Sequence, residues 1–197
     1  MLLALYRLLT RAAGPLISLY LRRRLAKGRE DPVRLPERLG QPGLPRPVGS
    51  VVWCHAASVG EAISVLPLLE RFRLEHPAWS ILLTTGTVTS AQLLGERAPA
   101  GVIHQYVPVD RPGAVCRFLD HWQPQLALWV ESELWPNLIS LTAARGIPMV
   151  LLNARMSARS ASGWRRWPRT ARQLLGAFDL ILPQTADDAA RFMRLGA

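Results

Sequence analysis

Short apolar runs alternate with longer helical stretches from Val51 to the end of the chain. The runs are Val51–Cys54, Ile81–Thr85, Val102–Val107, Leu126–Val130, Met149–Leu152 and Leu180–Leu182. The stretches between and after them are Ala62–Glu75, Ser90–Arg97, Pro112–His121, Pro136–Arg145, Ser160–Leu175 and Ala186–Leu195. This alternation predicts an α/β fold, a Rossmann-like parallel sheet with helices on both faces, over residues 50–197.

Polar residues follow the ends of these predicted strands. They are His55, Thr84 and Thr85, Asp110, Glu131, and the segment Asn153–Arg155. Ligands of open parallel sheets gather at the carboxyl ends of strands, so these positions are the candidate site. The sequence contains neither GxGxxG nor GxxxxGK[ST], and a dinucleotide or P-loop site therefore lacks its main support.

The segment His55–Glu61 connects the first predicted strand to a helix. One interpretation is a capping box, in which Ser58 binds the amide of Glu61 and the glutamate reaches back. The other is a catalytic base, because a helix N-terminus favours the carboxylate anion and Gly60 allows close approach of a ligand. The capping box does not require His55, the two alanines or Gly60.

Two acids follow the buried run Leu126–Val130. If the strand continues, Glu131 and Glu133 lie on the same side, as paired carboxylates for acid/base chemistry would. Solvated loop acids are the alternative. Arg155, after the fifth strand, is a candidate phosphate ligand or an ordinary surface arginine. No His, Cys or Asp spacing supports a metal site.

The chain carries a formal charge of +10, and residues 1–46 hold ten Lys or Arg against three acids. Residues 1–26 are apolar and basic, with Arg7, Arg11, Gly14 and Ser18 forming a narrow polar stripe. A membrane span needs ~20 apolar residues. The arginines and the Gly14-Pro15 pair favour a helix lying in the plane of an anionic membrane surface. A true span and an ordinary soluble helix are the alternatives.

Further basic residues lie between Arg155 and Arg172, interleaved with Trp164 and Trp167. This pattern is typical of a membrane interface or of a solvated helix face. Residues 27–49, rich in Pro and Gly, are expected to form a connector. The two cysteines lie far apart and indicate a reducing compartment without a disulfide framework.

Taken together, these segments resemble the 3-deoxy-D-manno-octulosonic acid (Kdo) transferase family of lipopolysaccharide assembly. The matching pieces are His55–Glu61, Thr84–Ser90, Tyr106–Asp110, Glu131–Asn137, Asn153–Ser160 and Gln184–Ala197. They recur in family order and cover nearly the whole chain. The basic and apolar N-terminus also resembles the membrane anchor of the family.

The resemblance implies the acceptor-side, N-terminal half of a GT-B glycosyltransferase on the cytoplasmic face of the bacterial inner membrane. Such an enzyme moves Kdo from CMP-Kdo, its donor substrate, to a lipid A precursor (lipid IVA), without a cofactor or metal. The resemblance makes Glu61 the general base and gives Glu131 a transition-state role. We expect His55, Ser58, Gly60, Thr84, Thr85 and Arg155 to bind the acceptor.

The chain departs from the family pattern at Val88, where a proline is usual, at Ala158, where an acid is common, and in length. The resemblance ends with the acceptor-side domain, so the donor-binding domain is expected to be absent and the 197-residue form inactive alone. The alternative function is a basic Rossmann-like module that binds a membrane or nucleic acid without catalysis. We do not expect nucleic acid as a partner, because no recognition motif is present.

Overall fold

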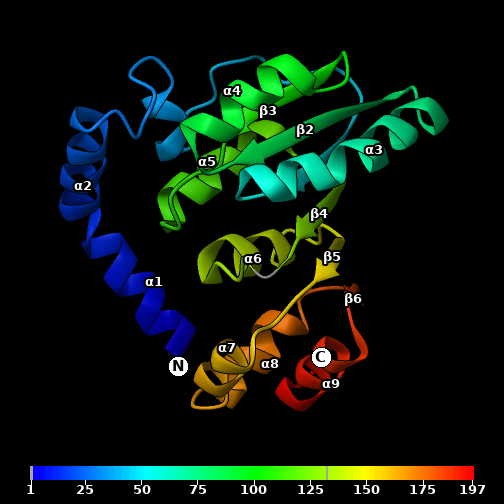
Figure 1. The fold of residues 1–197 in the computed structure, drawn as a ribbon. Helices are drawn as coiled ribbons and strands as arrows, with labels where there is room; N and C mark the ends of the chain where they lie inside the picture. The colour runs from blue at the N-terminus through cyan, green and yellow to red at the C-terminus, as the bar shows by residue number, and fades with distance from the viewer. Residues whose placement is uncertain (1, 132) are drawn as a thin grey trace.

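The computed structural model describes residues 2–131 and 133–197; Met1 and Ser132, the latter within the Glu131–Asn137 segment, lie outside the described residues. Six strands form one sheet in the order β3-β2-β1-β4-β5-β6, and all the pairings are parallel (Figure 1). The strands are β1 Ser50–His55, β2 Trp79–Thr85, β3 Val102–Tyr106, β4 Leu126–Val130, β5 Met149–Ala154 and β6 Leu180–Pro183. The predicted fold class is confirmed.

The helices of the domain lie close to the predicted ranges. They are α3 Val59–Glu75, α4 Val88–Arg97, α5 Pro112–Trp122, α6 Pro136–Ala143, α7 Ala158–Trp164, α8 Pro168–Leu175 and α9 Ala186–Leu195. One prediction was wrong, because residues 160–175 form two helices rather than one. Pro168 has no amide hydrogen to continue a helix and forces Trp167 out of the helical region, at φ −131° and ψ 58°.

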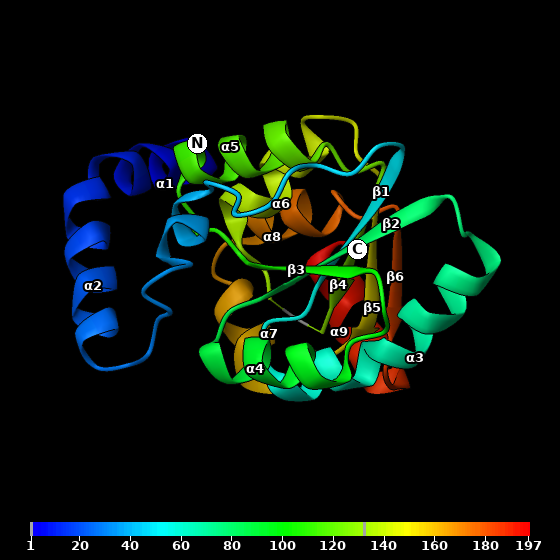
Figure 2. The same cartoon turned by 90° about the horizontal axis from the view of Figure 1, so that it is seen from above.

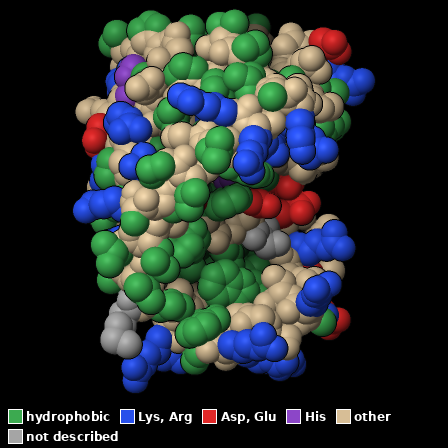
Figure 3. Space-filling model, turned by 90° about the vertical axis from the view of Figure 1, so that its left-hand side faces the viewer, with side chains coloured by type: hydrophobic (Ala, Val, Ile, Leu, Met, Phe, Trp, Pro, Cys, Tyr) green, Lys and Arg blue, Asp and Glu red, His purple; other side chains and the backbone are tan. Residues whose placement is uncertain are grey.

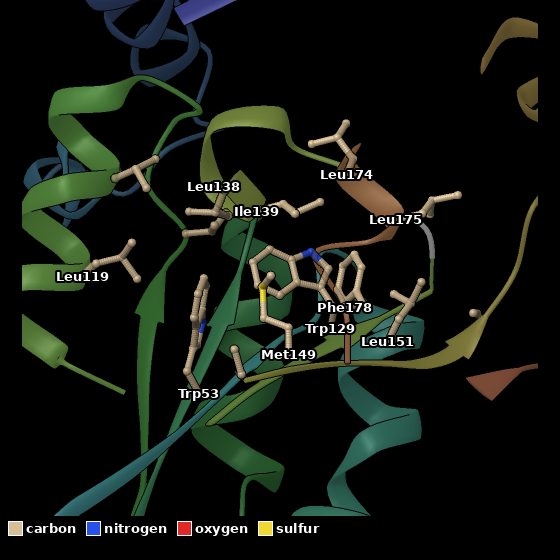
Figure 4. Close-up of a cluster of buried hydrophobic side chains, with 14 of the residues drawn as sticks. Trp53, Leu119, Trp129, Leu138, Ile139, Met149, Leu151, Leu174, Leu175 and Phe178 are labelled. Carbon is tan, nitrogen blue, oxygen red and sulfur yellow. The ribbon is translucent and has the colours of Figure 1, made fainter. Parts of the chain in front are cut away.

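Helices cover both faces of the sheet, and successive residues of each strand point to opposite faces. Val51 and Trp53 of β1 belong to a core packed on α5, α6 and α8, whereas Val52 and Cys54 belong to a second core under α3 and α4. The first core is the larger and is rich in aromatic rings; Trp53 and Trp129 lie edge to face with ring centres 4.8 Å apart (Figure 4).

The N-terminal segment forms two helices, α1 Leu2–Ala12 and α2 Gly14–Ala26, bent by 62° at Ala13. The prediction of a single helix was wrong, because Pro15 at the start of α2 cannot donate the amide hydrogen that would join it to α1. Figures 1 and 2 show the pair at one side of the domain. No single described helix has the length and apolarity of a membrane span, and α1 and α2 meet that test only as a bent pair.

The polar side of α1 faces the domain and the leucine side faces outward. Arg7 donates to Ser140 Oγ at 2.9 Å, and Thr10 Oγ1 accepts from Asn137 Nδ2 at 3.0 Å. The exposed leucines of the two helices are Leu5, Leu8, Leu9, Leu16 and Leu19. The polar stripe seen in the sequence is therefore at least partly a packing surface, and Arg7 is engaged within the protein rather than free for lipid phosphates.

Residues 27–49 form the predicted connector, which includes a 3-10 helix, Leu35–Leu39. Its two buried glutamates attach it to the domain and to α2, respectively. Glu37 Oε2 accepts from the amide of Tyr106 at 2.7 Å, on the edge strand β3, and Glu30 pairs with Arg24 at 2.6 Å. The connector thus covers one free edge of the sheet and fixes the end of α2.

Candidate active site at the carboxyl edge of the sheet

The strand order reverses between β1 and β4, which are paired in the middle of the sheet. The chain leaves β1 toward α3 on one face and leaves β4 toward α6 on the other face. Such a switch point opens a crevice beyond the carboxyl ends of the strands, where ligands of open α/β sheets bind. The space-filling view of the side to which the strands point shows acidic side chains beside hollows lined by hydrophobic groups, with Lys and Arg around them (Figure 3).

Glu61 lies in the first turn of α3, next to this crevice. Ser58 is the N-cap residue, and its hydroxyl oxygen accepts from the Glu61 amide at 3.3 Å. Glu61 Oε1 accepts from the Ser58 hydroxyl and Oε2 from the Ala57 amide, both at 2.8 Å. The capping interpretation of the sequence is therefore correct in geometry.

The same contacts leave room for a chemical role of Glu61. Its exposed fraction is 7%, so access is narrow, but a carboxylate has about four acceptor sites and the contacts above occupy two. Gly60 is exposed, and a Cβ added to it would meet no atom within 4 Å. The side chain of Glu61 is thus oriented by its loop, and the space beside the preceding residue, Gly60, is open.

Glu131 and Glu133 follow β4 but do not share a face of the strand. The strand ends at Val130, and Glu131 has φ +61°, a left-handed conformation that is unusual for a residue with a side chain. Burial raises the pKa of the Glu131 carboxyl, the negative charge of Glu61 raises it further, and Arg155 opposes the shift. Burial also raises the pKa of Glu133, and the charges of Glu61 and Glu131 add to that shift. The structure therefore brings the three glutamates and Arg155 into electrostatic range of one another.

His55 is fully buried at the end of β1, and burial lowers its pKa to about 4. Its Nδ1 lies 3.0 Å from Thr84 Oγ1, which also accepts from the Trp53 indole at 2.9 Å. Thr85 is buried as well, and its hydroxyl lies 2.9 Å from His104 Nε2. The two threonines predicted to bind the acceptor are thus buried and engaged with histidines, whereas Arg155 is exposed on the loop after β5.

Asp110 has a structural role that the sequence interpretation did not assign. Its carboxylate accepts from the amides of Asn137 and Leu138, in the first turn of α6, and from the Tyr6 hydroxyl. The signal was present in the sequence, because Trp135 before Pro136 offers no side-chain cap and an external group has to supply one. Asn153, in the candidate segment at the end of β5, also has a left-handed backbone, at φ +50°, a conformation that asparagine adopts more readily than most residues.

Among the residues that the structure describes, no three His, Cys, Asp or Glu side chains gather in a way that would hold a metal ion. Trp164 and Trp167 border an open cavity of about 500 Å³ together with Arg159, on and just after α7. The basic and tryptophan-bearing surface predicted from the sequence is thus present near the loop that carries Arg155.

Residues 33–197 match the family model described as 3-deoxy-D-manno-octulosonic-acid transferase (kdotransferase). A probable mitochondrial 3-deoxy-D-manno-octulosonic acid transferase of Arabidopsis thaliana is 41% identical over 198 residues, which cover 98% of this chain and 44% of the relative. The 3-deoxy-D-manno-octulosonic acid transferase of Bordetella pertussis is 37% identical over 202 residues, covering 98% of this chain and 46% of the relative. The chain therefore spans less than half the length of these curated relatives.

The fold is also similar to solved structures of low sequence identity. A UDP-GlcNAc 2-epimerase from Neisseria meningitidis, bound to UDP-GlcNAc, has a TM-score of 0.53 at 13% identity, with 75% of this chain and 44% of that chain covered. A putative UDP-N-acetylglucosamine 2-epimerase from Listeria monocytogenes has a TM-score of 0.51 at 12% identity, covering 76% of this chain and 42% of that chain. These likenesses concern the Rossmann-like fold alone. Because the family model matches residues 33–197, most of the chain, the chain belongs to the 3-deoxy-D-manno-octulosonic acid transferase family.

Proposed function

We propose that this chain is the acceptor-side part of a glycosyltransferase that moves Kdo from CMP-Kdo to a hydroxyl of a tetraacyl lipid A precursor. The observation that carries the proposal is the position of Glu61 at the switch point of the sheet, oriented by its loop and within electrostatic range of Glu131, in a chain of this family. The curated relatives are more than twice as long as the matched region. We therefore assign the binding of CMP-Kdo to the part of such enzymes that lies outside this chain.

In the proposed reaction Glu61 accepts the proton of the acceptor hydroxyl. The hydroxyl oxygen forms a bond to the anomeric carbon of Kdo, and the bond from that carbon to the CMP phosphate oxygen breaks, so CMP leaves with the bonding electrons. The hydrogen bonds from Ala57 and Ser58 hold the carboxylate in one orientation, as a general base requires. Glu131 would act on the transition state, and Arg155 would bind a phosphate of the acceptor.

The test of the base uses a chimera of residues 1–197 with the C-terminal half of the Bordetella pertussis relative, assayed for transfer of Kdo to the lipid A precursor. Glu61→Gln preserves a side-chain acceptor for the Ala57 amide and is expected to lower turnover by roughly 10²–10⁴. Glu70→Gln, on an exposed position of α3, is the matched control and should leave turnover unchanged. Near-normal turnover of the Glu61 variant would remove the base assignment.

The isolated 197-residue chain is expected to show no transfer under the same conditions. Transfer by the isolated chain would contradict the assignment of the donor site to the other half. Binding of RNA with a steep salt dependence, together with indifference to the lipid, would favour a nucleic-acid-binding module instead.

We further propose that the leucine face of α1 and α2 lies on an anionic membrane, on the cytoplasmic face of the bacterial inner membrane. The outward leucines and the exposed Arg22 and Arg23 support this, because burial of apolar area and attraction to anionic lipid both strengthen interfacial binding. Replacing Leu5, Leu9 and Leu16 with serine should release the protein from sedimented phosphatidylglycerol vesicles. The same triple replacement at exposed Ile63, Leu68 and Leu74 of α3 is the matched control, and equal release by both would refute the placement.

A further inference from the structure

A cavity of about 490 Å³ lies between the N-terminal helices and the carboxyl edge of the sheet. Its size falls in the range of small-molecule sites. One wall comes from α1 and α2, and the others come from the loops after β1, β2, β3 and β4. The lining residues that carry the argument are Tyr6, Ile17, His55, Ala57, Asp110 and Glu133. The N-terminal helices thus contribute directly to a cavity at the candidate active site.

Two residues that line the cavity, His55 and Arg38, each carry a buried side-chain nitrogen with no hydrogen-bond partner among the described residues. His55 is among its lining residues, and its Nε2 is buried without a hydrogen-bond partner in the part of the chain that the structure describes. Its other ring nitrogen is engaged with Thr84. A buried polar group without a partner is destabilising, so a ligand that supplies a partner would recover part of that cost.

The charges around the cavity disfavour an anion. Burial keeps the imidazole of His55 neutral at neutral pH, with its pKa lowered to about 4. The two lining arginines, Arg24 and Arg38, share the single carboxylate of Glu30 at 2.6 and 3.5 Å. Asp110 and Glu133 add two carboxyl groups to the lining, so the acidic groups at the cavity outnumber the arginines. The remaining walls are largely apolar, including Ile17 and the buried residues Val107 and Pro108. The cavity therefore suits an uncharged, mostly apolar group.

We propose that this cavity binds an uncharged, hydroxyl-bearing apolar segment of the acceptor, and that His55 Nε2 forms a hydrogen bond with its hydroxyl. A hydroxyl both donates and accepts, so it satisfies Nε2 in either tautomer of the ring. The identification of the ligand as part of the acceptor rests on the proposed function. Ala57 lines the cavity and donates to Glu61 Oε2 at 2.8 Å, so an occupant lies next to the proposed base.

Either an alkyl chain or the face of a sugar ring carries this chemistry, and simple probes separate the two. The probes are 1-octanol for the chain, methyl β-D-glucopyranoside for the ring, and octyl phosphate for an anionic group on the same chain. Binding to the 197-residue protein is followed by the ¹⁵N chemical shift of His55 Nε2. We expect 1-octanol or the glucoside to move this resonance and octyl phosphate to bind more weakly than 1-octanol.

Ile17→Trp fills the cavity from the α2 side without touching a carboxylate. It should weaken binding of the effective probe by about ten-fold or more, since overfilled space excludes a ligand. Leu16→Trp, on the exposed side of the same helix, is the matched control and should leave binding unchanged. The wild-type titration is decisive even if the first variant fails to fold.

An unchanged His55 resonance with both neutral probes would overturn the proposal, as would equal binding by the two tryptophan variants or tighter binding of octyl phosphate. No donor sugar is involved in these measurements. Their failure is therefore distinguishable from failure of the transfer assay, and transfer can be lost by Glu61→Gln while the cavity still binds its probe.

Discussion

Replacing Asp110 with alanine is expected to destabilise the protein far more than replacing an exposed surface aspartate would. Asp110 Oδ1 accepts from the Leu138 amide at 2.7 Å, and Oδ2 accepts from the Asn137 amide at 3.1 Å and from the Tyr6 hydroxyl at 2.9 Å. One side chain therefore caps α6 and joins α1 to the loop after β3. Its loss leaves two amides and a phenol without their partner.

The magnitude follows from these contacts. Loss of a side-chain cap costs about 1 kcal/mol, and each hydrogen bond to a charged group contributes about 1.5–3 kcal/mol. Burial opposes part of this gain, since it raises the pKa of the Asp110 carboxyl despite the three donors. We therefore expect Asp110→Ala to lower the free energy of unfolding by about 2–4 kcal/mol.

The assay is equilibrium urea denaturation at pH 7.5 of the wild type, Asp110→Ala, Tyr6→Phe and the double variant. Because Tyr6 acts through Asp110, the two single effects should not add, and the coupling free energy should be about 1 kcal/mol. Asp120→Ala is the control, since that carboxylate is largely exposed and pairs with Arg145 at the surface. A loss below about 1 kcal/mol for Asp110→Ala, or strict additivity with Tyr6→Phe, would refute the reasoning.

Three further outcomes are expected. Burial lowers the pKa of His55 to about 4 and of His104 to about 3. Because the unfolded imidazoles bind protons more readily, the free energy of unfolding is unaffected above the unfolded-state pKa near 6.5 and falls below it, by about 2 kcal/mol for each histidine at pH 5. The double variant His55→Gln/His104→Gln should flatten this dependence on pH in urea denaturation. An unchanged dependence would contradict the prediction. Phe118→Ala should cost about 3–5 kcal/mol in the same assay, because the ring is fully buried 4.9 Å from that of Trp53, and a cost under about 1 kcal/mol would exclude tight packing. Gln123→Gly should raise stability by about 0.5–1 kcal/mol, because Gln123 ends α5 at φ +43°, and any loss would show that its side chain matters more than backbone strain.

The central strands were predictable to within a few residues because β1, β2 and β4 are apolar runs that are almost wholly buried. Leu126–Val130 was predicted at its observed bounds, and β5 differs only by the addition of Asn153 and Ala154. The prediction of the start of α3 was less accurate. The helix begins at Val59, directly after its cap at Ser58, and not at Ala62 as predicted. Helix ends depend on single hydrogen bonds, which periodicity does not reveal.

The candidate site was only partly predictable. The positions of His55, Glu61 and Glu131 at strand or helix ends followed from the order of elements, because parallel strands place their carboxyl ends at one edge. The left-handed backbone of Glu131 and the contribution of α1 to the cavity lined by His55 did not follow. The placement of α1 depends on contacts between segments that are far apart in the chain, such as Tyr6 with Asp110.

The amino-acid sequence by itself determined the parallel α/β architecture, the capped turn that carries Glu61 and the basic, apolar character of the N-terminal segment. These are local properties, since hydrophobic periodicity and capping act over a few residues. Only the tertiary structure decided which side of α1 faces the domain, that Asp110 caps α6, and that His55 has one ring nitrogen without a partner beside a cavity. The physical reason is that a buried polar atom finds its partner by position in space, and sequence separation gives no measure of that distance.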